Sequence, residues 1–182
     1  MIILTSFKRS KEIMKQLNIN RGNIYSVARW QPKGYNYKEL PFLSATDKNG
    51  SKLLLRNFEN PVEDYANALR EGYKARWEEI KRWLDSLDND KDIILTCWCP
   101  YSTQTQKQIK EYGTFCCHTG LIGKMINKNR PDITVVLDED RHEKLIPEWK
   151  PEIYLPLKEY LRRNGFWKSV ESIVNTIHLF DL

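Results

Sequence analysis

The hydrophobic and polar positions of this chain alternate between short apolar runs and longer segments with helical spacing. Runs of four or five residues rich in Ile, Leu and Val are typical of buried strands. They occupy residues 2–5, 24–28, 93–96 and 133–137. Segments whose apolar residues recur three or four positions apart predict amphipathic helices. These cover residues 8–17, 62–87, 119–127 and 157–177, with an interruption at 164–165.

The order of these elements predicts an α/β fold. A strand, a helix and a second strand within residues 2–28 favour a parallel sheet with a right-handed crossover. Prolines, glycines and polar residues predict loops at 29–41 and 101–115, a hairpin turn at 47–50 and a charged turn at 138–143. We expect residues 1–182 to form a single domain, a mostly parallel sheet flanked by helices, with a C-terminal helical extension at about 151–182.

Composition and charge exclude several classes of protein. The chain is 41% hydrophobic and 29% charged, which is ordinary for a globular protein. No apolar run approaches the roughly 20 residues that a membrane span needs. The first residues lead directly into a strand pattern instead of a signal peptide, so we expect a cytoplasmic protein without a membrane partner. The net charge of +5 is mildly favourable to phosphate-bearing partners but low for a dedicated nucleic-acid binder.

The cysteines mark the candidate chemistry. All four lie, with one of the three histidines, between the strand at 93–96 and the helix at 119–127. The carboxyl end of a strand is where α/β sheets place ligand sites. Cys116 and Cys117 lie just before the predicted helix, whose amino end lowers the pKa of a thiol. This pattern predicts Cys117 as a nucleophile, His118 as an acid/base or orienting group, and Cys97 as a resolving thiol or a second wall of the pocket.

Two other interpretations of the same residues remain open. The thiols of Cys97, Cys99 and either Cys116 or Cys117, with the imidazole of His118, could bind zinc, although the C-x-C spacing of the first pair is not the usual one. Free cysteines are also among the most buried residue types, so some of the four could be packing residues alone. The second interpretation fits Cys97 best, because it continues a buried strand.

A second candidate feature is the basic aromatic loop (residues 29–38). Arg29, Trp30, Lys33 and Tyr35 interleave positive and aromatic side chains, a mixture that can bind phosphates and stack bases. The aromatic rings could equally cover the edge of the sheet while the lysines face water. If the strand at 24–28 neighbours the strand at 93–96, this loop and the cysteines would share one crevice.

These motifs resemble two uncharacterised families, domain of unknown function 4326 and domain of unknown function 488. The resemblance rests on C-W-C-P at 97–100, on C-H at 117–118 with Gly120 close behind, and on the strand that ends at Arg29. It covers residues 2–137 approximately and implies the α/β fold and the place of the site. The families supply no settled reaction.

The leading hypothesis is therefore an intracellular enzyme acting on a nucleotide or another phosphate-bearing, possibly nucleic-acid-linked, substrate. The alternative is a non-catalytic binding or regulatory module, with a protein partner and with cysteines that are structural or bind zinc. In either case three positive charges in the basic aromatic loop predict weak, salt-sensitive binding to single-stranded nucleic acid.

Overall fold

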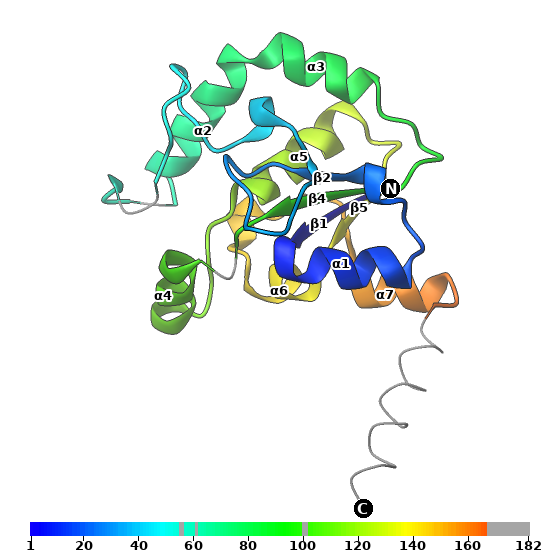
Figure 1. Ribbon diagram of the computed structural model, residues 1–182. Coiled ribbons are helices and arrows are strands. Elements are labelled where there is room, and N and C mark those ends of the chain that lie inside the picture. The colour runs from blue at the N-terminus through cyan, green and yellow to red at the C-terminus, as the bar shows by residue number, and fades with distance from the viewer. Residues whose placement is uncertain (55–56, 61, 100–101, 167–182) are drawn as a thin grey trace, which may run out of the picture.

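The protein is a six-stranded, wholly parallel sheet between layers of helices, as the hydrophobic pattern predicted. The computed structural model describes residues 1–54, 57–60, 62–99 and 102–166 (Figure 1). The strands follow the order β3-β2-β4-β1-β5-β6 across the sheet. They are β1 (Ile2–Ser6), β2 (Ile24–Ser26), β3 (Lys38–Glu39), β4 (Ile93–Cys97), β5 (Val135–Leu137) and β6 (Leu155–Pro156). The helices are α1 (Phe7–Gln16), α2 (Asp64–Ala75), α3 (Trp77–Asp85), α4 (Thr103–Tyr112), α5 (His118–Asn129), α6 (Glu139–Lys144) and α7 (Leu157–Arg163).

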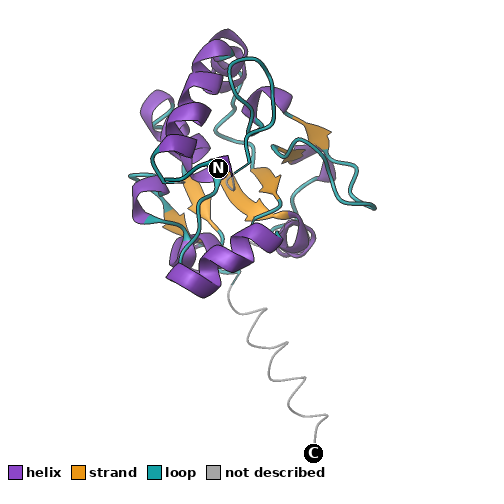
Figure 2. Ribbon diagram, turned by 90° about the vertical axis from the view of Figure 1, so that its left-hand side faces the viewer, coloured by secondary structure: helices purple, strands orange, loops and turns teal. Residues whose placement is uncertain are grey.

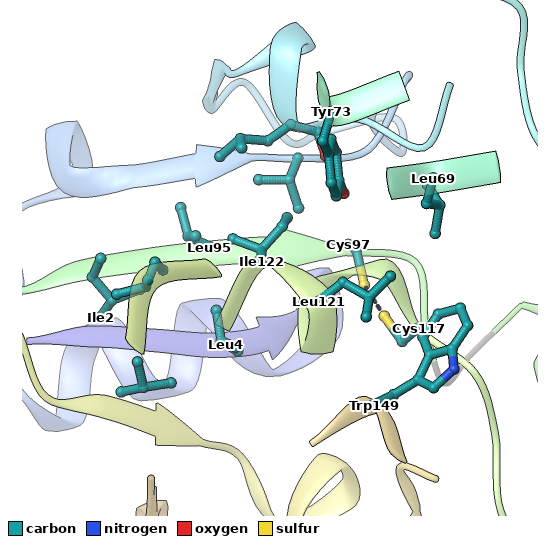
Figure 3. Packing of buried hydrophobic residues seen from close by; sticks show 14 of the residues in the cluster. Ile2, Leu4, Leu69, Tyr73, Leu95, Cys97, Cys117, Leu121, Ile122 and Trp149 are labelled. Carbon is teal, nitrogen blue, oxygen red and sulfur yellow. Dashed lines mark hydrogen bonds between the residues drawn. The ribbon is translucent and has the colours of Figure 1, made fainter. Parts of the chain in front are cut away.

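Helices cover both faces of the sheet (Figures 1 and 2), and the sheet divides the core in two. Successive side chains of a strand point to opposite faces, so Ile2 and Leu4 enter one core and Ile3 the other. The larger core packs α2, α3 and α5 onto the sheet, and Figure 3 shows Leu121 and Ile122 of α5 against the strands. The smaller core lies under α1 and α7. None of the described helices is long and apolar enough to cross a membrane.

The connections of β1 and β4 leave the sheet on opposite faces. These strands are neighbours, with Ile2 opposite Ile93 and Ser6 opposite Cys97. From β1 the chain passes through α1 on one face to β2, and from β4 it passes through α5 on the other face to β5. Such a reversal leaves a crevice outside the carboxyl ends of the two strands. Cys97 stands at that point.

The strand register confirms the condition for a shared crevice. Strand β2 pairs with β4 along Ile24–Ser26, with Ser26 opposite Thr96. The ends of both strands, and therefore Arg29 and Cys97, lie at the same edge of the sheet. The predicted strand at 24–28 is shorter by two residues, since Val27 and Ala28 already turn into the loop.

The single helix predicted at 62–87 is wrong: two helices meet at Arg76. Its backbone leaves the helical range (φ −112°, ψ 18°). Its guanidinium donates to the main-chain oxygens of Phe42 at 3.1 Å and Asp47 at 3.0 Å. The apolar spacing continues across the break because both helices pack on the same core, so periodicity alone does not reveal it.

The predicted loop at 101–115 and the charged turn at 138–143 are also wrong, because each contains a helix. Helix α4 begins after Ser102, whose hydroxyl accepts from the Thr105 amide, and ends at Gly113 in the left-handed region (φ +73°). Helix α6 begins after Asp138, whose carboxylate accepts from the Glu139 amide. In both cases the capping residues are the sequence feature that indicates a helix, because neither segment has an apolar stripe.

The remaining elements agree with the sequence except in small details. Short strand β3 lies within the predicted loop at 29–41, and β6 adds a sixth strand that the pattern did not predict. An antiparallel bridge between Thr46 and Lys52 flanks the predicted turn at 47–50. The C-terminal helix α7 ends before Gly165, as predicted, and the helix expected to continue from there to residue 177 lies outside the described residues after position 166.

Candidate functional site

Three cysteine sulfurs meet at the carboxyl edge of the sheet. The Sγ atoms of Cys97, Cys99 and Cys117, called here the sulfur group, all lie within 4.8 Å of one another. The Sγ atoms of Cys97 and Cys117 are 3.3 Å apart (Figure 3). Cys97 is the last residue of β4 and Cys117 is the residue before α5, so the sheet and the helix bring the two together.

The neighbouring cysteine, Cys116, does not belong to this group. The backbone at Cys117 is extended (φ −144°, ψ 127°), and successive side chains of an extended chain point in opposite directions. The amide of Cys116 donates to Oε1 of Gln108 at 3.2 Å. Of the alternatives Cys116 and Cys117 for the third zinc thiol, the group that could hold a metal ion contains Cys117, and it does not contain the predicted ligand His118.

The ring of His118 reaches the end of strand β2. Its Nε2 lies 3.1 Å from the main-chain oxygen of Val27, at the end of β2. Because a carbonyl oxygen only accepts, Nε2 carries the proton in this contact. The contact fastens the start of α5 to the strand that leads into the basic aromatic loop.

A fully buried arginine, which the sequence analysis missed, completes the sulfur group. Arg141 of α6 is 0% exposed. Its Nη2 donates to Sγ of Cys97 at 2.9 Å and to the main-chain oxygen of Cys99 at 2.8 Å. Its Nε donates to Oγ1 of Thr119 at 3.3 Å, and that hydroxyl lies 3.0 Å from Sγ of Cys117. A buried charge needs a partner of opposite sign, so Arg141 favours a negative charge on the sulfurs.

The sulfurs differ in acidity. Burial raises the pKa of Cys117, but two effects outweigh it: hydrogen bonds from Cys97, Cys99 and His118, and the positive charge of Arg141. The pKa of Cys117 is therefore well below the ordinary value. Burial, together with the hydrogen bond to Cys117, raises the pKa of Cys97 to about 12. The hydrogen bond to Cys117 also raises the pKa of Cys99 well above the ordinary value. The group thus favours one thiolate, at Cys117, held by two thiol donors.

A pocket of about 240 Å³ opens beside the sulfur group. Of the three cysteines, Cys99 lines it, together with His118. The other walls carry basic and aromatic side chains (Arg29, Trp30, Lys52, Tyr65 and Trp98) together with small, aliphatic and hydroxyl side chains (Ala28, Ala45, Leu53, Leu54, Ser102 and Thr105). None of the described residues that line the pocket is acidic.

The indole of Trp30 forms an accessible platform at this pocket. It is 51% exposed, and its ring centroid lies 4.4 Å from that of Trp98. The Nε1 of Trp98 donates to the main-chain oxygen of Trp30 at 2.9 Å, which fixes the loop. The ammonium of Lys52 lies 5.4 Å from the Trp30 ring centroid. Lys52 was not among the predicted site residues, since nothing near it in the sequence shows that the turn at 47–50 folds back over this loop.

The structure divides the predicted basic aromatic loop into two parts. Arg29 and Trp30 line the pocket, whereas Lys33 and Tyr35 do not. Lys33 is exposed. The ring of Tyr35 packs edge-on against Phe7 at 5.4 Å, so this part of the loop covers the α1 side of the sheet.

No protein-family model, curated protein or solved structure matches this chain. The resemblance of the C-W-C-P and C-H motifs to the two families of unknown function therefore stays a prediction from the residues themselves.

Proposed function

We propose that this protein is an enzyme that acts on a nucleotide or another phosphate-bearing substrate at the pocket beside the sulfur group. One observation carries the proposal: Arg29 and Trp30 line the same pocket as Cys99 and His118. The residues predicted to bind an anion and to stack on a ring, in the basic aromatic loop, therefore lie beside a thiol of the sulfur group.

The basic and aromatic walls would bind the substrate. Arg29 and Lys52 carry positive charge, and a guanidinium matches two phosphate oxygens at once. The exposed face of Trp30 would stack a planar ring, a contact that contributes about 1–3 kcal/mol for a nucleic-acid base. The lack of acidic side chains among the described lining residues favours an anionic ligand.

Cys117 is the nucleophile in this proposal, with Cys97 and His118 holding it in place. Because Cys117 is 2% exposed, the reacting group of the substrate must enter between Cys99 and His118, which both line the pocket. A bond then forms between Sγ of Cys117 and the electrophilic atom of the substrate. The bond to the leaving group breaks, and its electron pair departs with that group.

Two matched pairs of variants test the proposal. A nucleoside monophosphate titrated by calorimetry should bind Arg29→Ala about tenfold more weakly than wild type, whereas Lys33→Ala, outside the pocket, should bind like wild type. In a screen for turnover of nucleoside phosphates, Cys117→Ser should lose activity and Cys116→Ser should keep it. Equal binding by the two loop variants would refute the assignment of the pocket, and full activity of Cys117→Ser would refute the nucleophile.

A metal-binding module is the second candidate, favoured by the three sulfurs within 4.8 Å of one another. Thiolate is a preferred ligand of zinc, and a site with three protein ligands leaves a fourth position for another molecule. Because Cys99 lines the pocket, the fourth position would be open toward the pocket.

Metal analysis of the purified protein separates the two candidates. A zinc module should contain about one zinc per chain and release it on denaturation. Cys97→Ser should lose the zinc and Cys116→Ser should retain it. Equal zinc content in these two variants, or none in the wild type, would contradict a site at the sulfur group.

A further inference from the structure

We propose that the sulfur group is a site of reversible oxidation by hydroperoxides, which ends in an internal disulfide bond at Cys117. The inference goes beyond the proposed enzyme, because it concerns a covalent change of the protein and needs no phosphate-bearing substrate. It rests on the arrangement of three sulfurs, of which one meets the pocket and two lie behind it.

The outer sulfur is that of Cys99. Cys99 is half-buried and lines the pocket, so a small molecule in the pocket meets this cysteine first. The Oγ1 of Thr105 lies 3.5 Å from its sulfur and donates to it. Cys97 and Cys117, at 1% and 2% exposure, are screened from the pocket.

The inner sulfurs lie close enough to act as resolving thiols. A disulfide requires sulfurs about 2.05 Å apart. Cys117 Sγ is already 3.3 Å from Cys97 Sγ and within 4.8 Å of Cys99 Sγ, so the sulfurs are neighbours for either bond. Arg141 and Thr119 hydrogen-bond to sulfurs of this group, which shows that the thiols occupy polar positions as well as filling space.

The reaction balances in two steps. The thiol proton of Cys99 passes to the Cys117 thiolate, to which Cys99 is hydrogen-bonded, and the sulfur of Cys99 attacks the O–O bond of the hydroperoxide ROOH. A sulfenic acid forms on Cys99, two electrons pass from the sulfur to the peroxide, and the alkoxide takes a proton from water and leaves as ROH. Sγ of Cys117 then attacks the sulfur of Cys99, so that the disulfide forms and the hydroxyl leaves as water together with the thiol proton.

The disulfide can then move inward and be reduced. Attack by Cys97 on Cys117 would form the Cys97–Cys117 disulfide and return Cys99 as a thiol. Two equivalents of an external thiol R′SH restore the protein and leave as the disulfide R′SSR′. A prompt resolving step protects Cys99 from irreversible oxidation to the sulfinic acid.

The experiment treats the reduced, chelator-washed full chain with hydrogen peroxide, blocks free thiols with N-ethylmaleimide and measures intact mass. A sample of the wild type weighed before blocking should be about 2 Da lighter than the reduced protein, because two thiol hydrogens are lost. A thiol reductant should restore the mass of the reduced protein. Peptide mapping should join the segment that contains Cys97 and Cys99 to the segment that contains Cys117. Cys116→Ser, the matched neighbour, should form the same disulfide.

Further variants identify the parts played by the other sulfurs. Cys117→Ser should form no disulfide between these segments and should instead accumulate sulfinic acid on Cys99. Cys99→Ser should slow disulfide formation by at least about tenfold, because the remaining sulfurs are screened from the pocket. The proposal is overturned if the folded wild type forms no disulfide at Cys117, or if Cys99→Ser oxidises at the wild-type rate. These masses are read without any substrate, so failure here leaves the proposed enzyme untouched.

Discussion

Arg141 is the residue on which the sulfur group most depends. It is fully buried, yet it comes from a short helix that the sequence presents as a charged turn. Asp138 begins that helix and accepts hydrogen bonds from Thr5 at 2.7 Å and from Arg9 at 3.3 Å. These contacts tie α6 to the end of β1, and thereby aim the guanidinium of Arg141 at Cys97.

Replacing Arg141 by methionine should destabilise the protein. Methionine keeps much of the length but leaves the oxygen of Cys99 and the sulfur of Cys97 without their donor, and it removes the positive charge next to the Cys117 thiolate. Removal of one partner from a buried charged contact costs on the order of 3 kcal/mol. Urea denaturation measures the change in the free energy of unfolding.

The control is Arg162→Met, on the exposed face of α7, where the guanidinium contacts Glu159 in water. This variant should leave the denaturation midpoint nearly unchanged. If Arg141→Met were as stable as wild type, the guanidinium would not be compensating a charge on the sulfurs.

Two glycines of helix α5 allow it to pack closely against a neighbouring segment of the chain. A Cβ added at Gly120 would lie 2.2 Å from the main-chain oxygen of Trp149, and one at Gly123 would lie 2.5 Å from Cγ of Pro151. Contacts under 3.0 Å require the neighbour to move, and a main-chain oxygen does so at a cost. These glycines let α5 approach the chain that follows α6, close to Cys117.

Gly120→Ala therefore separates packing from helix propensity. Propensity alone favours alanine by about 1 kcal/mol. The clash with Trp149 should reverse the sign and destabilise the protein by about 1–3 kcal/mol, as overpacking usually does. Thermal and urea denaturation measure the effect, with Lys128→Ala, exposed on the same helix, as the control. A Gly120→Ala protein more stable than wild type would mean that the chain around Trp149 moves away freely.

At the scale of the whole molecule, charge decides how nucleic acid can bind. The net charge is +5, and the basic aromatic loop contributes Arg29, Lys33 and Lys38 with no acidic residue between them. Three phosphate contacts predict a slope of about −2 to −3 for log affinity against log salt. The stacking surface of Trp30 favours single strands over duplex.

Fluorescence anisotropy of a labelled single strand and a matched duplex, at two salt concentrations, measures this slope. We expect weak binding, with the single strand preferred and both affinities falling as salt rises. Tight duplex binding that persists at high salt would place the nucleic-acid surface elsewhere on the molecule.

The hydrophobic pattern and the rules of chain crossover predict the architecture and the edge of the sheet at which the candidate site lies. Short runs rich in β-branched residues, separated by helical stripes, predicted the parallel sheet because burial on both faces requires such strands. The connections between parallel strands and helices then placed Cys97, Cys117 and Arg29 at one edge. Local composition and the rules of chain crossover are sufficient for both conclusions.

Tertiary structure alone decided which side chains meet at that edge. Cys117 and Cys116 are neighbours of the same type, and only the extended backbone before α5 turns one of them toward Cys97. Arg141 is 44 residues from Cys97, and Lys52 reaches Trp30 from a separate turn. These contacts depend on how whole elements pack, because a side chain finds its partner in space and no local pattern in the sequence specifies that partner.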